Sequence, residues 1–305
     1  MDPSPPYILH HYDASPFSEK VRLMFGIEAI AWRSVVIPTL MPKPDLIPLT
    51  GGYRRTPVMQ IGADIFCDTQ VILAEIVRRK GSAAPTAALS KGVNFWADRL
   101  FFQTTVPVVF AELGEHVPKA FIEDREKMSG RAFDVVAMKA AATPMQGQWR
   151  AQAAWIEGAL ATGGADFLDG PRAGPTDVAA YLNIWFLGGT APAVAEKLLT
   201  GFDRLAAWRA RLGAIGHGSR TEMTGPEALA EARDATPGDF TRHDPADPLP
   251  AAPGDPITVF ADDYGSDPVS GVLVAANAER VVLARDGDGP LHVHFPRAGY
   301  IVRLG

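Results

Sequence analysis

The chain has 305 residues, of which 47% are hydrophobic and 21% charged, a composition typical of a folded globular protein with at least two domains. A net charge of −6 gives no general attraction to nucleic acid or to an anionic membrane surface, so neither is expected as a partner. No run reaches the ~18 apolar residues that span a bilayer. The first residues, Met1 to Pro6, lack the basic and apolar regions of a signal peptide, so we expect a cytoplasmic protein.

The first stretch with a clear pattern is a strand followed by a helix. Residues 7–12 form an extended apolar and aromatic run, and Ser15-Pro16 is a helix cap followed by proline at the first helical position. Apolar residues then recur at helical spacing up to Phe25, and Gly26 can end the helix. The free N–H groups and positive dipole end of such a helix favour an anion. We expect this anion to be a thiolate.

The next stretch alternates strands and helices. Residues 31–37 read as a strand, and the breaker-rich residues 38–55 as a loop. Residues 56–61 and 64–67 read as a hairpin, and Asp68-Thr69 caps a helix that ends at Gly81. This order predicts one α/β sheet covered by helices, which we assign to a domain of residues 1–81.

The remaining chain divides at two linkers. Residues 82–88 read as the first linker, and the helical patterns that follow predict an all-helical domain over residues 89–236. Residues 237–256 contain six prolines, which exclude a helix and a central strand, so they form the second linker. Five strand-like runs over residues 257–305 predict a small all-β module, either a sheet or an open barrel.

Four motifs in register resemble the glutathione S-transferase superfamily over roughly residues 7–215. Ser15-Pro16-Phe17-Ser18 lies where serine-type members carry their activating serine, and Thr56-Pro57 matches the cis-proline turn of the family. Asp68-Thr69 matches the acidic and hydroxyl pair before the third helix. Gly174-Pro175-Thr176-Asp177 matches the capping element of the helical domain, except that Gly174 replaces the usual Ser or Thr. The resemblance implies a thioredoxin-like domain that binds glutathione, followed by a helical domain. Residues 257–305 resemble no family that we recognise.

In this family the thiol comes from glutathione, and Ser15 would donate a hydrogen bond to its sulfur. A cysteine thiol with a pKa near ~8.5 is only ~3% ionised at pH 7, and lowering that pKa to ~6.5 makes most of it nucleophilic. A hydroxyl donor and a helix N-terminus both favour the thiolate. The alternatives are that Ser15 is only a cap, or that Ser18 or Tyr12 activates the thiol.

The other motifs imply contacts for the rest of the tripeptide. A cis bond between Thr56 and Pro57 would turn the backbone of Thr56 toward the ligand, where it pairs as a strand would. Asp68 would bind the ammonium of the γ-glutamyl group, and Thr69 with the helix N-terminus would bind its carboxylate. Arg54 or Arg55 would hold the glycyl carboxylate. Each of these residues also has a purely structural interpretation, as an edge-strand proline, a helix cap or a solvated loop charge.

Further candidates carry weaker signals. Phe101, Phe102 and Phe110 are guesses for the wall of the acceptor site, because they follow the first linker. The single Cys67 reads as a small buried hydrophobe and excludes an intramolecular disulfide. His292 and His294 share one strand face but have no third ligand nearby, so we expect no metal site.

The sequence therefore predicts a glutathione S-transferase-like enzyme in which the bound thiolate attacks a small electrophile. The motifs are equally compatible with isomerisation or dehalogenation, whereas disulfide reduction is disfavoured because serines occupy both cysteine positions of the redox turn. A second hypothesis is a non-catalytic member whose C-terminal β module binds a partner. A third is that this module merely covers an exposed face of the helical domain. The family resemblance also implies a homodimer.

Overall fold

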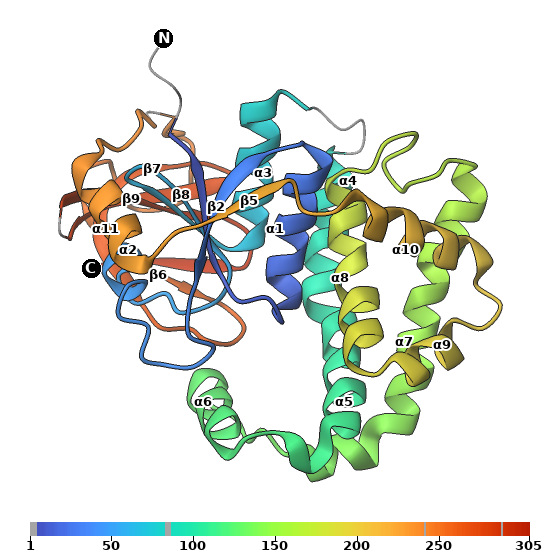
Figure 1. Cartoon of the computed structure of the whole chain (residues 1–305). Helices are drawn as coiled ribbons and strands as arrows, with labels where there is room; N and C mark the ends of the chain where they lie inside the picture. The colour runs from blue at the N-terminus through green and yellow to red at the C-terminus, as the bar shows by residue number, and fades with distance from the viewer. Residues whose placement is uncertain (1–4, 83–86, 241, 288) are drawn as a thin grey trace.

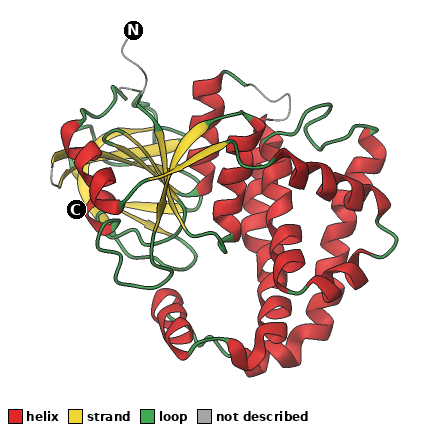
Figure 2. Ribbon diagram, in the orientation of Figure 1, coloured by secondary structure: helices red, strands yellow, loops and turns green. Residues whose placement is uncertain are grey.

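The computed structural model describes residues 5–82, 87–240, 242–287 and 289–305. A strand-rich part, which holds both ends of the described chain, lies beside a bundle of helices (Figures 1 and 2). The strands are β1 (Tyr7–His11), β2 (Ala31–Val36), β3 (Val58–Ile61), β4 (Asp64–Cys67), β5 (Ser219–Glu222), β6 (Pro256–Ala261), β7 (Val269–Ala276), β8 (Arg280–Gly287), β9 (Gly289–Pro296) and β10 (Tyr300–Leu304).

The helices are α1 (Pro16–Ile27), α2 (Ile47–Thr50), α3 (Thr69–Lys80), α4 (Ala87–Trp96), α5 (Phe102–Leu113), α6 (Lys119–Ser129), α7 (Val135–Gly163), α8 (Pro175–Thr190), α9 (Pro192–Leu199), α10 (Asp203–Ile215) and α11 (Gly225–Asp234). A π-helical turn, Ala97–Phe101, joins α4 to α5, and a 3-10 turn, Gly114–His116, follows α5.

The N-terminal part has the element order that the sequence predicts. β1 pairs in parallel with β2 and antiparallel with β3, and β3 pairs antiparallel with β4. The helix signals are also confirmed: Ser15 caps α1, Asp68 caps α3, and Gly81 ends α3 with a left-handed φ of 65°. This arrangement is the expected thioredoxin-like sheet covered by helices.

The five C-terminal strands are confirmed, but the expectation that they form a sheet of their own is wrong. They are antiparallel to one another, and β9 pairs in parallel with β4, so one sheet runs in the order β10-β6-β7-β8-β9-β4-β3-β1-β2-β5. At this junction His294 Nε2 donates to Asp64 Oδ1 at 2.8 Å, and the Gly238 N–H donates to Asp64 Oδ2 at 2.7 Å. Because the His294 bond joins β9 to β4, it helps to fix the register of β9 on β4, whereas the Gly238 bond ties the segment after α11 to the same carboxylate.

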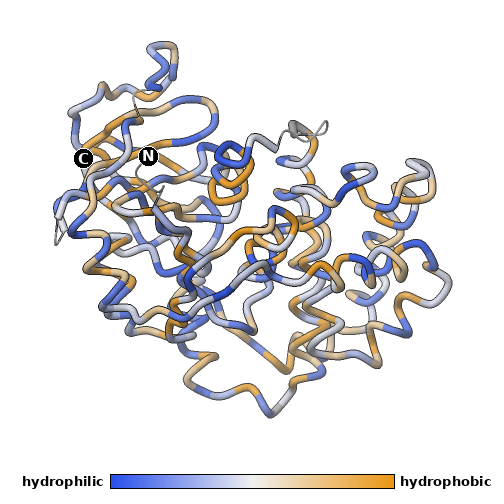
Figure 3. Tube along the Cα trace, turned by 45° about the horizontal axis from the view of Figure 1, so that its top comes forward, coloured by the Kyte–Doolittle hydropathy of each residue, from blue (hydrophilic) through white to orange (hydrophobic). Residues whose placement is uncertain are grey.

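Alternate residues of the first strands face two different cores. Leu9 and Met59 belong to a core shared with α1, α3 and the helical bundle. Ile8 and Ile65 belong to a second core, in which the C-terminal strands, α2 and α11 cover the opposite face. Figure 3 shows hydrophobic stretches in both the strand-rich part and the bundle. The C-terminal strands therefore cover an apolar face of the N-terminal sheet, and the interpretation that they cover a face of the helical domain is wrong.

Residues 219–234 lie on the strand-rich part, although the sequence places them in the helical domain. β5 pairs in parallel with β2, from Ala31 opposite Ser219 to Ser34 opposite Glu222 (Figure 1). α11 contributes Ala228 and Ala232 to the second core. The described residues of the second linker have no helix or strand except for the last one, Pro256, with which β6 begins. The first linker lies largely outside the described residues. No helix in the described part of the chain is long and apolar enough to span a membrane.

The glycine at the start of α8 has a steric reason. A Cβ at Gly174 would lie 2.5 Å from Oδ2 of Asp169, closer than real contacts allow. That same oxygen accepts from the Thr176 N–H at 2.8 Å, and Asp177 Oδ2 accepts from the Gly174 N–H at 3.0 Å. Asp169 therefore supplies the cap that a Ser or Thr side chain would otherwise provide.

A buried ion pair joins α3 to the C-terminal strands. Arg280 Nη1 of β8 lies 3.2 Å from Glu75 Oε2, and both side chains are at least nine-tenths buried. Burial raises the pKa of the Glu75 carboxyl, but hydrogen bonds from Arg78 and Arg79 and the charge of Arg280 outweigh it and lower this pKa to about 2.

We expect this coupling to make stability depend on pH. The pKa of Glu75 in the folded chain lies below the unfolded value of 4.5. The ion pair therefore contributes its full stabilisation of the fold above pH ~5, and this stabilisation is lost as the pH falls toward the folded pKa. The wild type should have a larger free energy of unfolding than Glu75→Gln at pH 7, measured with urea. This difference should shrink by about 2 kcal/mol between pH 7 and pH 3. Glu123→Gln, which removes an exposed pair with Lys119, should show no such change. An equal difference at both pH values would contradict this coupling.

Candidate active site

A cavity of about 600 Å³ lies between the strand-rich part and the helices, and most of the predicted site residues line it. Its lining includes Ser15 and Tyr12 from the first turn, Thr56 and Pro57 from the loop before β3, and Asp68 and Thr69 from the start of α3. These residues come from three separate stretches of the sequence. A common position on one cavity makes them a candidate ligand site.

Ser15 has both a structural and an available chemical role. Its Oγ accepts a hydrogen bond from the Ser18 N–H at 3.1 Å, which caps α1, and the side chain also lines the cavity. Ser18 itself is fully buried and is absent from the described residues that line the cavity. This placement favours Ser15 over Ser18 as a donor to a ligand.

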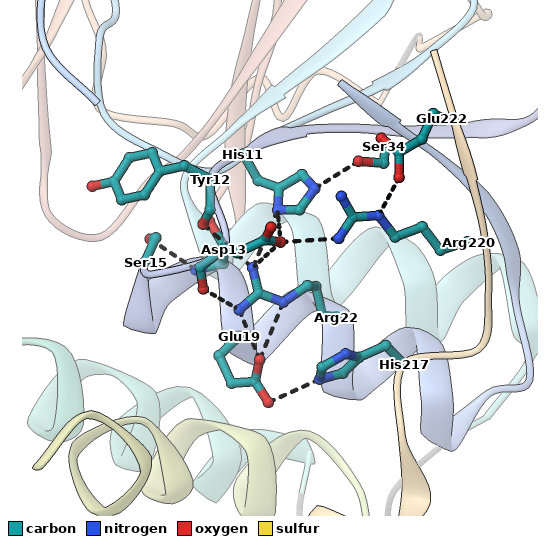
Figure 4. Close-up of polar contacts among 11 residues, drawn as sticks. His11, Tyr12, Asp13, Ser15, Glu19, Arg22, Ser34, His217, Arg220 and Glu222 are labelled. Carbon is teal, nitrogen blue, oxygen red and sulfur yellow. Dashed lines mark hydrogen bonds and ion pairs between the residues drawn. The ribbon is translucent and has the colours of Figure 1, made fainter. Parts of the chain in front are cut away.

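Tyr12 presents a second hydroxyl to the cavity. Burial raises the pKa of Tyr12 despite the charge of Arg125 and the hydrogen bond with Ser15. The phenol therefore stays protonated near neutral pH and can donate a hydrogen bond. His11 and Tyr12 extend in different directions from the chain, as expected for neighbours on a strand (Figure 4).

Hydrogen bonds from Arg22 hold the turn that carries Tyr12 and Ser15 in place (Figure 4). Its guanidinium donates to the Asp13 carbonyl at 2.8 Å and to Glu19 Oε2 at 2.8 Å. It also donates to His11 Nδ1 at 3.1 Å, so the His11 Nε2–H donates to Ser34 Oγ at 3.0 Å. Burial and the Arg22 charge lower the pKa of His11 to about 3, which keeps this ring neutral.

Residues of β5 and of the segment just before it extend the same network of hydrogen bonds and ion pairs. Arg220 donates to Asp13 Oδ1 at 2.9 Å and to Glu222 at 2.7 Å, and His217 lies 3.0 Å from Glu19 (Figure 4). The first turn of the site is thus supported by residues about 200 positions later in the chain.

The Thr56–Pro57 bond is cis, as the family resemblance implies. Lys43 lies beside it, because its Nζ donates to Thr56 Oγ1 and to the Arg54 carbonyl, both at 3.0 Å. Burial, followed by the charges of Arg125 and Arg54, lowers the pKa of Lys43 to about 8, so it is mostly protonated at pH 7. The sequence contained no signal for Lys43, which lies in a proline-rich loop.

Asp68 and Thr69 serve as caps and also line the cavity. Asp68 Oδ1 accepts from the Gln70 N–H at 2.9 Å, and its Oδ2 accepts from the Tyr300 hydroxyl at 3.1 Å. Thr69 Oγ1 accepts from Lys20 Nζ at 2.9 Å. The carboxylate and the helix N-terminus are therefore held in place, and both are available to an ammonium or carboxylate group.

A second carboxylate on the cavity lining, that of Asp98, comes from the π-helical turn of the helical part. Its two oxygens lie 2.7 and 3.0 Å from Lys20 Nζ, and burial raises its pKa above the usual value despite that cation. π-helical turns are frequent at functional sites. Helical periodicity does not predict such a turn, so we did not select Asp98 as a site residue from the sequence.

The two arginines are ion-paired. Arg54 Nη2 lies 2.5 Å from Asp124 Oδ1 of α6, and Arg55 pairs with Asp263 and lies 4.4 Å from the ring centroid of Tyr264. The solvated-loop interpretation is therefore wrong for both. Because Arg55 already pairs with the carboxylate of Asp263, it is a weaker candidate for the glycyl carboxylate of glutathione than the sequence suggested.

Two of the three phenylalanines predicted for the acceptor site line the cavity, and the third lies in the core. Phe102 and Phe110 line the cavity. Phe101 instead lies fully buried in the helical core, with its ring 5.1 Å from Trp96 and 5.5 Å from Trp149. The expectation for Phe101 is wrong because neighbouring helix positions face different sides.

β10 and the loops after β6 and before β10 supply part of the cavity wall, which we did not predict from the sequence. Asp263, Tyr264, Gly299 and Tyr300 line it. The Gly265 N–H donates to the Met128 carbonyl of α6 at 2.7 Å, so the loop after β6 bridges to the helical side. In the part of the chain that the structure describes, no group of three or more His, Cys, Asp or Glu residues could hold a metal.

Comparison with known proteins identifies the family. The model of the glutathione S-transferase N-terminal domain matches residues 9–84. A GST-like protein from Pseudomonas syringae is 33% identical, with a TM-score of 0.80 and coverage of 98% of this chain and 99% of that one. No match was found among curated proteins.

Two further structures share the fold. They are the Tau class glutathione S-transferase from mango, Mangifera indica (13% identity, TM-score 0.53, 75% of this chain and 97% of that one), and glutathione S-transferase III in its apo form (17%, 0.51, 77% and 100%). Both leave about a quarter of this chain unmatched, whereas the Pseudomonas syringae protein matches almost all of it. With that 33% identity over nearly the full length of both proteins, the chain belongs to the glutathione S-transferase superfamily.

Proposed function

We propose that this protein is a glutathione-dependent transferase that activates the thiol of glutathione for attack on a small electrophile. The observation that carries the proposal is the convergence of Ser15, Thr56, Asp68 and Thr69 on one cavity. Each was selected from the sequence for a different chemical group of the tripeptide. The reaction class, whether transfer, isomerisation or dehalogenation, stays open.

In the proposed binding mode each end of glutathione meets a complementary group. The γ-glutamyl ammonium would pair with Asp68, and its carboxylate would lie at Thr69 and the N-terminus of α3. The cysteinyl backbone would pair with Thr56, and Lys43 offers a cation for the glycyl carboxylate. The sulfur would then lie near Ser15 and Tyr12, whose hydroxyls favour the thiolate.

Glutathione binding is the first test of this proposal. A ligand that binds only the folded chain at 100 times its dissociation constant adds ~2.7 kcal/mol of stability. We therefore expect millimolar glutathione to raise the melting temperature by several degrees, measured by calorimetry. Glycine and free glutamate at the same concentration serve as controls. No shift at all would reject the glutathione proposals and leave the non-catalytic alternative.

Ser15→Ala tests which hydroxyl activates the thiol. If the thiol pKa returns from ~6.5 to ~8.5, turnover of a chlorodinitrobenzene should fall by at most roughly 25-fold at pH 7 and approach the wild-type rate above pH 9. Asp134→Ala is a matched control, since Asp134 caps α7 through the Ala137 N–H and lies outside the cavity lining. Unchanged activity in Ser15→Ala together with lost activity in Tyr12→Phe would move the role to Tyr12.

The homodimer and the cytoplasmic location stay predictions. β9 occupies the edge of β4, Arg280 of β8 contacts Glu75 of α3, and Glu279 of the preceding turn contacts Lys91 of α4. A dimer would therefore use surfaces other than the edge of β4 and these parts of α3 and α4. Light scattering should give twice the 32.7 kDa chain mass, and a mass of one chain would contradict the dimer.

A further inference from the structure

The helical side of the cavity is an aromatic wall. Phe110, Phe121 and Phe133 form a cluster in which the ring centroids lie 4.8 to 5.8 Å apart, and all three line the cavity. Phe102 and Phe186 extend this wall, with centroids 6.1 Å apart. Such a wall favours a flat, apolar ring as ligand.

Positive charge is in excess next to this wall. Arg54 and Arg125 share one carboxylate, that of Asp124, at 2.5 and 3.0 Å. Lys43, which is buried, has only neutral acceptors among the described residues, a threonine hydroxyl and a backbone carbonyl. We call Lys43, Arg54 and Arg125 the cationic cluster. Three cations thus lie near one anion, whereas the other cavity arginines, Arg55 and Arg99, each have their own aspartate.

The cationic cluster also has an unmet hydrogen-bond donor. The Nε–H of Arg54 is buried without an acceptor in the described part of the chain, as is the Nε–H of Arg55 on the same cavity. Buried guanidinium donors are normally satisfied, so an orphaned one in a cavity wall indicates a missing anionic or polar partner.

Arg125 connects the cationic cluster to the aromatic wall. It belongs to α6, and its guanidinium carbon lies 4.5 Å from the ring centroid of Phe121. Lys43 donates to Thr56 Oγ1 and to the Arg54 carbonyl, next to the proposed position of glutathione, whereas Arg125 contacts Phe121 of the aromatic wall. In the proposed binding mode Lys43 binds the glycyl carboxylate, which leaves Arg125 for an anion on the acceptor.

We infer that the electrophile is an aromatic compound that carries a carboxylate, with its ring on Phe110, Phe121 and Phe133 and its carboxylate at Arg125. This inference rests on the proposed function and adds the substrate class. A chloronitrobenzoate is a suitable probe. After the thiol has lost its proton to solvent, the thiolate sulfur attacks the carbon that bears chlorine, the C–S bond forms, and chloride leaves with the C–Cl electron pair.

The test compares 4-chloro-3-nitrobenzoate with the neutral 4-chloro-3-nitrobenzamide, which has the same leaving group and nearly the same shape. With each kcat/KM divided by the uncatalysed rate constant, we expect the wild type to prefer the benzoate by about tenfold or more, because a charge-assisted contact to Arg125 is made only by the acid. Arg125→Gln should remove most of this preference. Lys127→Gln, an exposed neighbour on α6 outside the cavity lining, should keep it.

Binding of the two reaction products provides a second readout that does not need turnover. Calorimetry should show S-(4-carboxy-2-nitrophenyl)glutathione binding about tenfold more tightly than the matching carbamoyl conjugate in wild type, and equally in Arg125→Gln. Equal binding or rates in wild type would overturn the inference while leaving the proposed function intact, provided that glutathione itself binds. If glutathione and both conjugates fail to bind, the proposed function fails and the inference falls with it.

Discussion

A single buried ammonium joins the parts of the molecule that form the cavity. Lys20 of α1 is 1% exposed, and its Nζ contacts Thr69 Oγ1 at 2.9 Å, Asn94 Oδ1 at 2.5 Å and Asp98 Oδ1 at 2.7 Å. All three of its protons therefore have acceptors, which is what makes a buried charge tolerable. Because two acceptors belong to the helical part and one to the start of α3, this contact fixes the relative position of the two sides of the site.

The C-terminal strands are part of the same unit and not an independent appendage. They cover the second face of the N-terminal sheet, and they place Tyr300 on Asp68 and Asp263 on Arg55. Tyr300 belongs to an edge strand, yet its hydroxyl reaches Asp68, which follows β4, five strands away in the sheet order. The sheet must therefore curl, and this curl brings the last strands of the chain to the cavity wall.

The motifs that were predictable from sequence are those whose chemistry is local. Ser15 and Asp68 are helix caps, so their neighbours along the chain define them, and the strand runs of residues 257–305 are visible from their composition. Lys20, Lys43 and Asp98 could not be predicted, since each acts through partners that are distant in sequence. The pairing of β9 with β4 was not predicted for the same reason. The alternation of residues predicts a strand but not the strand with which it pairs.

The proposed activation of the thiol depends most directly on where the sulfur of bound glutathione lies. A crystal structure of the chain with glutathione answers this. We predict that the sulfur lies within hydrogen-bonding distance of Ser15 Oγ, with the γ-glutamyl ammonium at Asp68. A sulfur remote from both the Ser15 and Tyr12 hydroxyls, or a tripeptide bound outside the cavity, would contradict the account.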